Sequence, residues 1–390
     1  MQLVAYGAQD IYLTGNPQIT FFKVVYRRHT NFAMESIEQT WSGNSTTSGS
    51  CTATISRNGD LVHRMYLELT TAGVVADANN PSSRSITDVK LEIGGQQIDK
   101  QSGLWMEAWA ELTEPNPSGH VGAMTAAGVV NGTLFQNMSG MGGVGNDAGT
   151  AGQAFRFFVP LQFWFCRNPG LALPLIALQY HEVKVILTHE LDTYFGSSKV
   201  SNNSLWCDYI YLDTDERRRF AQVSHEYLIE QVQEQTLSTP AGSSDLHFNH
   251  PVKELVWVDK TGNNGWSTVA NGSLTAVSTG TYQLKLNGHD RFAARNFKYF
   301  TRTQVWQHHS GAGGLNCEIA AATSGSCNDS IAVYSFALKP EEHQPSGTCN
   351  FSRIDNAQLV AVSGLADTIF AVNYNVLRIM SGMGGLAYSN

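Results

Sequence analysis

The chain has 390 residues, of which 42% are apolar and 15% are charged, and its formal net charge is −8. This acidic balance, without a block of Lys or Arg, argues against direct nucleic-acid binding, because neutralising phosphates requires clustered cations. The most apolar run, residues 171–178, contains Pro174 and is far too short to span a membrane. One hydrophobic core rarely serves so long a chain, so we expect two domains.

An apolar and aromatic segment, residues 6–33, begins the chain. A Gly-Asn-Pro turn at residues 15–17 precedes a run that carries Lys23, Arg27 and Arg28. Polar residues interrupt the apolar positions, so the pattern is not that of a secretory signal. The segment is expected to dock onto its own domain, onto a neighbouring copy, or onto a surface beneath it.

Strand patterns dominate the first half. Apolar residues alternate with polar ones in residues 65–70 and again in 89–93, as in half-buried strands. The dipeptide Asn58-Gly59 predicts a hairpin turn after a strand at 51–55. Residues 102–112 read as a helix with Leu104, Trp105 and other apolar residues on one side. Further strands are expected at residues 33–41, 97–99, 155–165, 181–187 and 205–212.

Two segments interrupt this pattern. Residues 113–153 are rich in Gly, Ala, Asn and Ser, and a loop of that length is usually functional or mobile. Residues 213–222 are polar and favour a helix, with Thr214 as a possible cap and acidic residues before Arg217, Arg218 and Arg219. We interpret this helix as the connector between domains, since the acids neutralise the Arg triplet.

The second half repeats the order of the first. Residues 284–290 form an alternating strand that ends at a Gly turn, as residues 91–97 do, and each precedes an aromatic helix-like piece. An aromatic strand follows in each half, at residues 155–165 in the first and at 331–338 in the second. The fold class is therefore all-β, a tandem double jelly roll of two eight-stranded β-sandwiches with short inserted helices. The expected parts are an arm at 1–20, a first jelly roll at 21–212, a connector at 213–224 and a second jelly roll at 225–390.

No motif predicts catalysis, a cofactor or a metal. Residues 140–145 match G-x-G-x-x-G, but Gly/Asn loop surrounds them where the dinucleotide motif needs a strand and a helix. His247 and His250 are three apart, so on a strand they point to opposite faces. Six cysteines lack a C-x-x-C pair. Of these, Cys317 and Cys327 flank a Gly/Ser loop, and whether they form a disulfide is left open.

Seven Asn-x-Ser/Thr patterns are candidates for N-glycosylation, which would be the only covalent attachment expected. They begin at Asn44, Asn131, Asn137, Asn202, Asn271, Asn328 and Asn350.

Several blocks of the sequence resemble one family. Residues 7–28, from Gly-Ala-Gln-Asp-Ile-Tyr-Leu-Thr-Gly-Asn-Pro-Gln to Tyr-Arg-Arg, closely resemble the start of major capsid proteins of nucleocytoplasmic large DNA viruses, especially those of chlorella viruses. The likeness continues nearly to the end of the chain, in order, through residues 56–61, 91–96, 169–183, 344–356 and 373–388. Four loops differ from this family: residues 113–153, 234–246, 259–280 and 307–330. These differences are compatible with a paralogue.

The resemblance implies a structural protein, not an enzyme. It implies homotrimeric pseudo-hexagonal capsomers that tile the icosahedral shell of the virion, assembled in the host cytoplasm. Expected partners are other copies of the chain, minor capsid or cement proteins, and a nearby internal membrane. Glycans are expected on outward loops, with Asn44 and Asn271 as the first candidates.

The resemblance also gives the opening segment a role. Residues 1–20 are expected to form an extended arm at the base of the first sandwich, and the first strand to begin in or after residues 21–26. Lys23, Arg27 and Arg28 are then candidates for the inner face of the shell.

Two other functions are compatible with tandem β-sandwiches. One is a viral surface protein that binds carbohydrate for host attachment, which would need an exposed aromatic platform; Trp266 or Trp306 could supply it. The other is a metal-dependent jelly-roll enzyme, which would need more converging His and carboxylate ligands than the sequence offers.

Overall fold

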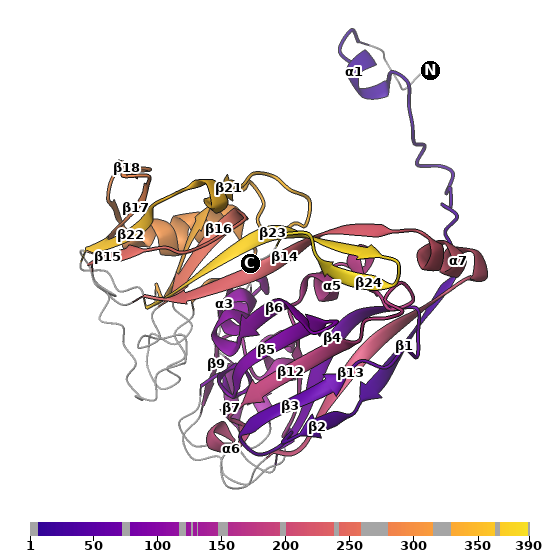
Figure 1. The fold of residues 1–390 in the computed structure, drawn as a ribbon. Helices are drawn as coiled ribbons and strands as arrows, with labels where there is room; N and C mark the ends of the chain where they lie inside the picture. The colour runs from indigo at the N-terminus through magenta and orange to yellow at the C-terminus, as the bar shows by residue number, and fades with distance from the viewer. Residues whose placement is uncertain are drawn as a thin grey trace.

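The computed structural model describes residues 7–71, 79–116, 122–125, 128–130, 132–146, 155–195, 200–237, 242–258, 280–314, 329–362 and 367–388. Its two halves are two β-sandwiches that lie side by side, and the amino-terminal segment extends away from both (Figure 1). The fold is a double jelly roll, as predicted.

The first jelly roll contains two five-stranded antiparallel sheets. One has the order β1-β13-β4-β10 with β11 beside β4: β1 (Phe32–Gln39), β13 (Val200–Leu212), β4 (Leu61–Thr71), β10 (Phe155–Pro160) and β11 (Leu173–Pro174). The other has the order β2 (Trp41–Gly43), β3 (Gly49–Thr54), β12 (Val183–His189), β5 (Ile86–Ile93) and β6 (Gln96–Ser102). Alternation along β4 is as expected: Met65, Leu67 and Leu69 are buried in the core between the sheets.

The second jelly roll repeats this arrangement around its own core. Its six-stranded sheet contains β14 (His225–Thr236), β23 (Thr368–Met380), β16 (Pro251–Val258) and β20 (Ile331–Ser335), with β21 (Cys349–Asn350) beside β16 and β24 (Met383–Leu386) beside β23. Its five-stranded sheet contains β15 (Gly242–Asp245), β22 (Ala357–Val362), β17 (Thr281–Leu286) and β18 (His289–Asp290), with β19 (Arg295–Asn296) beside β17.

Short helices and one small sheet connect these strands. The helices are α1 (Ile11–Thr14), α2 (Pro81–Arg84), α3 (Gly103–Thr113), α4 (Leu134–Ser139), α5 (Trp164–Arg167), α6 (Leu191–Tyr194), α7 (Thr214–Gln222), α8 (Gln304–His308), η1 (Pro169–Leu171), η2 (Tyr299–Thr303) and η3 (Phe351–Arg353). The small sheet, β8 (Gly128–Val130), β7 (Gly122–Thr125) and β9 (Val144–Asn146), lies inside the segment expected to be a long loop.

The hairpin predicted at Asn58-Gly59 is wrong. Strand β3 pairs with β2 and β12, whereas β4 belongs to the opposite sheet, so residues 55–60 cross between sheets. Gly59 is needed there for a different reason: a Cβ at this position would lie 2.8 Å from Cβ of Tyr209. Close packing against β13, and not a two-residue turn, therefore requires this glycine.

A two-residue hairpin turn does occur at residues 381–382, within the Gly-rich stretch 381–385. Ser381 and Gly382 both have positive φ and join β23 to β24 in a hairpin. The hairpin packs on the first jelly roll, since Tyr180 N donates to Gly382 O at 2.9 Å.

Helix α3 joins the two jelly rolls into one body. The Ser102 hydroxyl caps its start by accepting from Trp105 N, as expected of Ser at this position. Every residue from Gly103 to Leu112 is buried, because the helix has two apolar faces. Met106 and Ala110 face the first core, while Leu104, Trp105, Ala108, Trp109 and Leu112 pack against valines and aromatic residues of the second jelly roll.

Candidate assembly surfaces

The amino-terminal arm, residues 7–31, is exposed at every position except Asp10, which is half-buried. Strand β1 begins only at Phe32, so residues 21–31 belong to the arm and not to the first sandwich. Exposed apolar side chains follow one another along it: Ile11, Tyr12, Leu13, Ile19, Phe21, Phe22, Val24, Val25 and Tyr26. Soluble monomers rarely expose so many large apolar groups together, and such a segment indicates an interaction surface.

Lys23, Arg27 and Arg28 are exposed on this arm. Among the described residues, none of the three forms an ion pair. The three cations lie with apolar neighbours on one exposed segment, and their place on the inner face of a shell stays a prediction.

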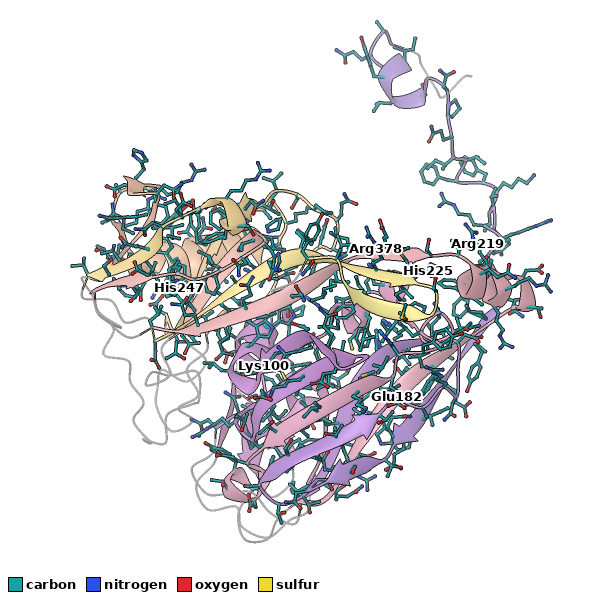
Figure 2. The ribbon with its side chains drawn as sticks, viewed as in Figure 1. Lys100, Glu182, Arg219, His225, His247 and Arg378 are labelled. Carbon is teal, nitrogen blue, oxygen red and sulfur yellow. The ribbon has the colours of Figure 1, made fainter. Side chains whose placement is uncertain are left out.

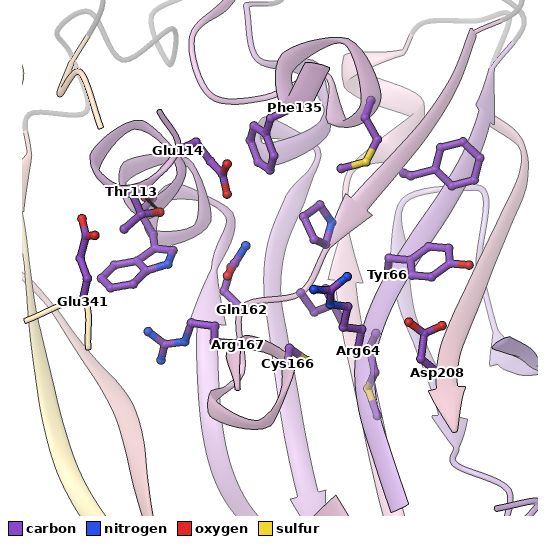
Figure 3. A pocket seen from close by; sticks show the side chains of 16 residues that line it. Arg64, Tyr66, Thr113, Glu114, Phe135, Gln162, Cys166, Arg167, Asp208 and Glu341 are labelled. Atoms are coloured by element: carbon purple, nitrogen blue, oxygen red, sulfur yellow. Dashed lines mark hydrogen bonds between the residues drawn. The ribbon is translucent and has the colours of Figure 1, made fainter. Parts of the chain in front are cut away.

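A hollow of about 630 Å³ lies between the outer face of the first jelly roll and the second (Figure 3). Tyr66 of β4 and Phe158 of β10 form an edge-to-face pair on its floor, with ring centroids 6.1 Å apart. Glu114 after α3 and Glu341 of the second jelly roll face it, and burial together with the charge of Glu341 raises the pKa of Glu114. Leu134 of α4, beside the lining residue Phe135, is 86% exposed.

Sequence reasoning did not identify this hollow, although part of it was readable. Arg64, Tyr66 and Phe158 alternate with buried neighbours, which alone places them on the outer face of the sheet. Only the tertiary fold adds Glu341, which lies more than 250 residues from Arg64 in the chain and comes from the other jelly roll.

A buried ion cluster stabilises the junction of the two jelly rolls. Oε2 of Glu230 lies 2.9 Å from the Arg167 guanidinium, and its Oε1 lies 2.9 Å from Nζ of Lys253. Burial alone raises the pKa of Glu230, but Arg167, His343 and Lys253 more than offset it and bring the pKa to about 2. Burial lowers the pKa of Lys253, although the negative charge of Glu230 opposes this shift. The two cations keep the Glu230 carboxylate charged in spite of its burial.

The G-x-G-x-x-G segment is explained by a carboxylate of the chain itself. The amides of Gly142 and Gly143 donate to Glu107 of α3 at 2.9–3.1 Å, and Asn80 accepts from the amides of Gly143 and Val144. Backbone amides that would hold a phosphate in a dinucleotide site are therefore used internally.

Four of the seven glycosylation candidates lie in the described part of the chain. Asn44, Asn137, Asn202 and Asn350 are all exposed. The Asn202 amide donates to Ser204 within its own Asn-x-Ser pattern, and the Asn350 side chain accepts from the amide of Ser352. Asn131, Asn271 and Asn328 lie outside the described residues.

The remaining candidates concern a metal site, a membrane span, a disulfide and an aromatic platform. In the described residues, no three His, Cys, Asp or Glu side chains are arranged to hold a metal, and no helix has the length and hydropathy to span a membrane. Cys317, Cys327 and Trp266 lie outside those residues. Trp306 is 81% exposed, but no finding supports the carbohydrate-binding alternative.

Two family models together match almost the whole chain. Residues 20–213 match the amino-terminal part of major capsid proteins, and residues 216–385 match the major capsid protein of large eukaryotic DNA viruses. The change from one model to the other falls at the start of α7.

Individual relatives agree with these models. The chain is 52% identical to a major capsid protein of Pyramimonas orientalis virus and 42% identical to that of Paramecium bursaria Chlorella virus 1, each over 100% of this chain and 99% of the relative. Among solved structures, PBCV-1 VP54 superimposes with a TM-score of 0.76 and 36% identity over 95% of this chain and 100% of VP54. A quasi-atomic model of the PBCV-1 capsid gives a TM-score of 0.75 with the same identity and coverage.

The double jelly roll, the continuous match to both models and these relatives lead to one conclusion: the chain belongs to the family of major capsid proteins of large eukaryotic DNA viruses, which form the capsid shell of the virion.

Proposed function

We propose that three copies of the chain form a homotrimeric capsomer with a pseudo-hexagonal outline, and that these capsomers tile an icosahedral shell. The observation that carries this proposal is the rigid union of two similar sandwiches through α3. Three such chains around a threefold axis present six sandwiches, which approximates sixfold symmetry. The role is structural and not enzymatic, and the protein makes no direct contact with nucleic acid.

The hollow of Figure 3 is the surface that we assign to contact between copies. It combines aromatic side chains with charged groups of both signs, Arg64 and Arg167 against Asp208 and Glu341. An interface of this kind gains free energy from apolar burial and specificity from its charges. Leu134, which is 86% exposed in the single chain, would be buried against a neighbouring copy, and that burial would favour association by about 1.5–3 kcal/mol.

The arm belongs to the inner side of the shell in this proposal. Lys23, Arg27 and Arg28 then lie near minor capsid proteins and the internal membrane, where anionic surfaces attract cations. Capsomers assemble in the host cytoplasm. Deleting residues 1–20 is expected to leave both sandwiches folded and to impair assembly of the shell.

Outward glycans are a further part of the proposal. Exposed Asn44, Asn137, Asn202 and Asn350 are accessible acceptors, and the three remaining candidates are Asn131, Asn271 and Asn328. Mass spectrometry of peptides from purified virions tests each site, and unmodified peptides at all seven would contradict it.

Light-scattering mass of the purified protein tests the capsomer directly. A trimer at micromolar concentration is expected, and imaging of larger assemblies should show hexagonal outlines. Leu134→Glu should shift the mass toward monomer. Val362→Glu, which changes a 56% exposed residue at the end of β22 that does not line the hollow, should not. A wild-type chain that stays monomeric would contradict the proposal.

A further inference from the structure

A second hollow lies at the end of the molecule from which the arm leaves. It has a volume of about 570 Å³, and three elements form it: the loop before β12, the carboxyl end of α7 and the β23–β24 hairpin. We call it the connector groove. Its lining residues are Ala177, Gln179, Tyr180, Ala221, Gln222, Val223, Ser224, Ile379, Met380, Ser381 and Gly382.

The connector groove combines uncharged polar groups with large exposed apolar side chains, so it can receive an apolar segment without burying a charge. None of its lining residues is charged. Tyr180 is 75% exposed, Val223 54% and Met380 49%, so large apolar side chains form an open wall. Because both jelly rolls and the connector contribute to it, the groove exists only in the folded two-domain chain.

The arm carries side chains that match this groove. Phe21 is 88% exposed and Phe22 97%, so burial of either ring in a groove would be favourable. The arm also leaves the body beside the groove. Phe32, the first residue of β1 after the arm, pairs with Leu212, which lies two residues before the start of α7. In Figure 1 the arm nevertheless extends away from its own body, so its own groove stays open.

Two exposed carboxylates lie at the edge of the groove, each beside a cation of its own chain, Lys184 or Arg378. Glu182, two residues after Tyr180, and Glu226, two residues after Ser224, expose 65% and 60% of their side chains. Figure 2 shows Glu182 on this side of the molecule, with Arg378, the ion-pair partner of Glu226, above it. Lys23 follows the two phenylalanines directly, so it can stay in solvent at this edge while they are buried.

We propose that the connector groove receives residues Phe21 and Phe22 from the arm of a second copy of this chain. Each copy would then give an arm and receive one, a head-to-tail contact that closes when the copies are arranged in a ring. The exchange explains why the arm is apolar although no described part of its own chain covers it. This inference rests on the proposed function in one respect: copies of the chain must associate.

A cross-linking experiment with two differently tagged chains tests the exchange. One chain carries Phe22→Cys and the other Val223→Cys, and a short bis-maleimide joins thiols that lie close together. Linked pairs that contain both tags are expected. Each single variant mixed with wild-type chain is the control, since it reports linkage through the native cysteines.

A second experiment uses charge, so that the result does not depend on cross-linking geometry. Val223→Asp should weaken association between copies at least tenfold, and Phe22→Lys on the partner chain should restore much of it. Val362→Asp, at a site outside the groove, is the matched control.

Each outcome decides between the possibilities. A further variant carries both Phe22→Cys and Val223→Cys in one chain; linkage within that chain, with none between differently tagged chains, would show that the arm binds its own groove and would overturn the exchange. Normal assembly of Val223→Asp, with or without binding of the arm to anionic vesicles, would also overturn it. Trimers that form without any arm contact would leave the capsomer proposal intact, whereas a wild-type chain that never associates would contradict both.

Discussion

Nε2 of His309 lies 2.9 Å from Oε2 of Glu254, and both side chains are completely buried. The other ring nitrogen, Nδ1, lies 3.0 Å from Oε1 of Glu341. Only a protonated imidazolium can donate to both carboxylates at once. The second jelly roll therefore contains a buried cation held between two acids, next to Trp109 of α3, whose ring lies edge-on to the imidazole at 6.4 Å.

This arrangement predicts a loss of stability at alkaline pH. Burial alone lowers the pKa of His309, but the charges and hydrogen bonds of Glu254 and Glu341 raise it to about 9. The folded pKa thus exceeds the unfolded value of about 6.5, so the stabilisation is fully present below pH 6.5 and is lost as the pH rises through 9. We expect the free energy of unfolding to fall by on the order of 2–3 kcal/mol over this window.

Urea unfolding at pH 6.5 and pH 9 measures this change, and His309→Gln is the control that should remove most of it. Asp99 does not interfere, because burial raises its pKa only to about 6, below the window. Equal pH dependence in both proteins would show that His309 is not the responsible group.

Removing one cation from the Glu230 cluster should be costly. Lys253→Met leaves a buried carboxylate with Arg167 as its remaining cation within 3 Å, and breaking a buried pair costs about 3–5 kcal/mol. Lys339→Met is the matched control, because Lys339 and Glu342 expose 66% and 56% of their side chains and an exposed pair contributes about 0–1 kcal/mol. Thermal unfolding of both variants makes the comparison, and similar midpoints would contradict the assigned role of the cluster.

Strand alternation and helix periodicity predicted much of the fold from the sequence. The buried positions of β4 and the helix at residues 103–113 follow from spacing alone, because one buried face imposes a period of two or 3.6 residues. The residues placed on the apolar side of α3, such as Leu104 and Trp105, are those that meet the second jelly roll. The other buried face of α3 was missed, because a helix buried all round gives little periodic signal.

Contacts between distant segments were beyond the sequence. Arg167 of α5 meets Glu230 of β14 and Lys253 of β16 only when the two jelly rolls pack together. The amides of Gly142 and Gly143 gave a cofactor-like motif, and their real partner, Glu107, precedes them by more than 30 residues. The wrong hairpin at Asn58-Gly59 has a similar origin, since turn chemistry alone does not tell a hairpin from a crossover between sheets.

A single methyl group at Gly311 should loosen the junction. Gly311 N donates to Leu112 O at 2.7 Å, and a Cβ at this glycine would lie 2.5 Å from backbone atoms at the end of α3. The backbone cannot move aside as a side chain would, so Gly311→Ala should cost about 1–3 kcal/mol. Gly170→Ala is the control, because the nearest atom there is a side-chain oxygen 3.3 Å away that can rotate. Urea midpoints compare the two, and an unchanged midpoint for Gly311→Ala would count against close packing at this contact.

Trp105 should determine whether the two jelly rolls unfold together. Its ring lies 5.2 Å from Phe370 and 5.4 Å from Trp109, measured between centroids, in the core that α3 shares with the second jelly roll. Trp105→Ala should remove about 3–5 kcal/mol and leave each sandwich with its own separate core. Calorimetry should then resolve two transitions where the wild type shows one, because coupling between the halves depends on this contact. Trp306→Ala changes an 81% exposed ring and should keep the single transition. If Trp105→Ala also unfolds in one step, the junction is held by the ion cluster and the α3 backbone contacts more than by the tryptophan.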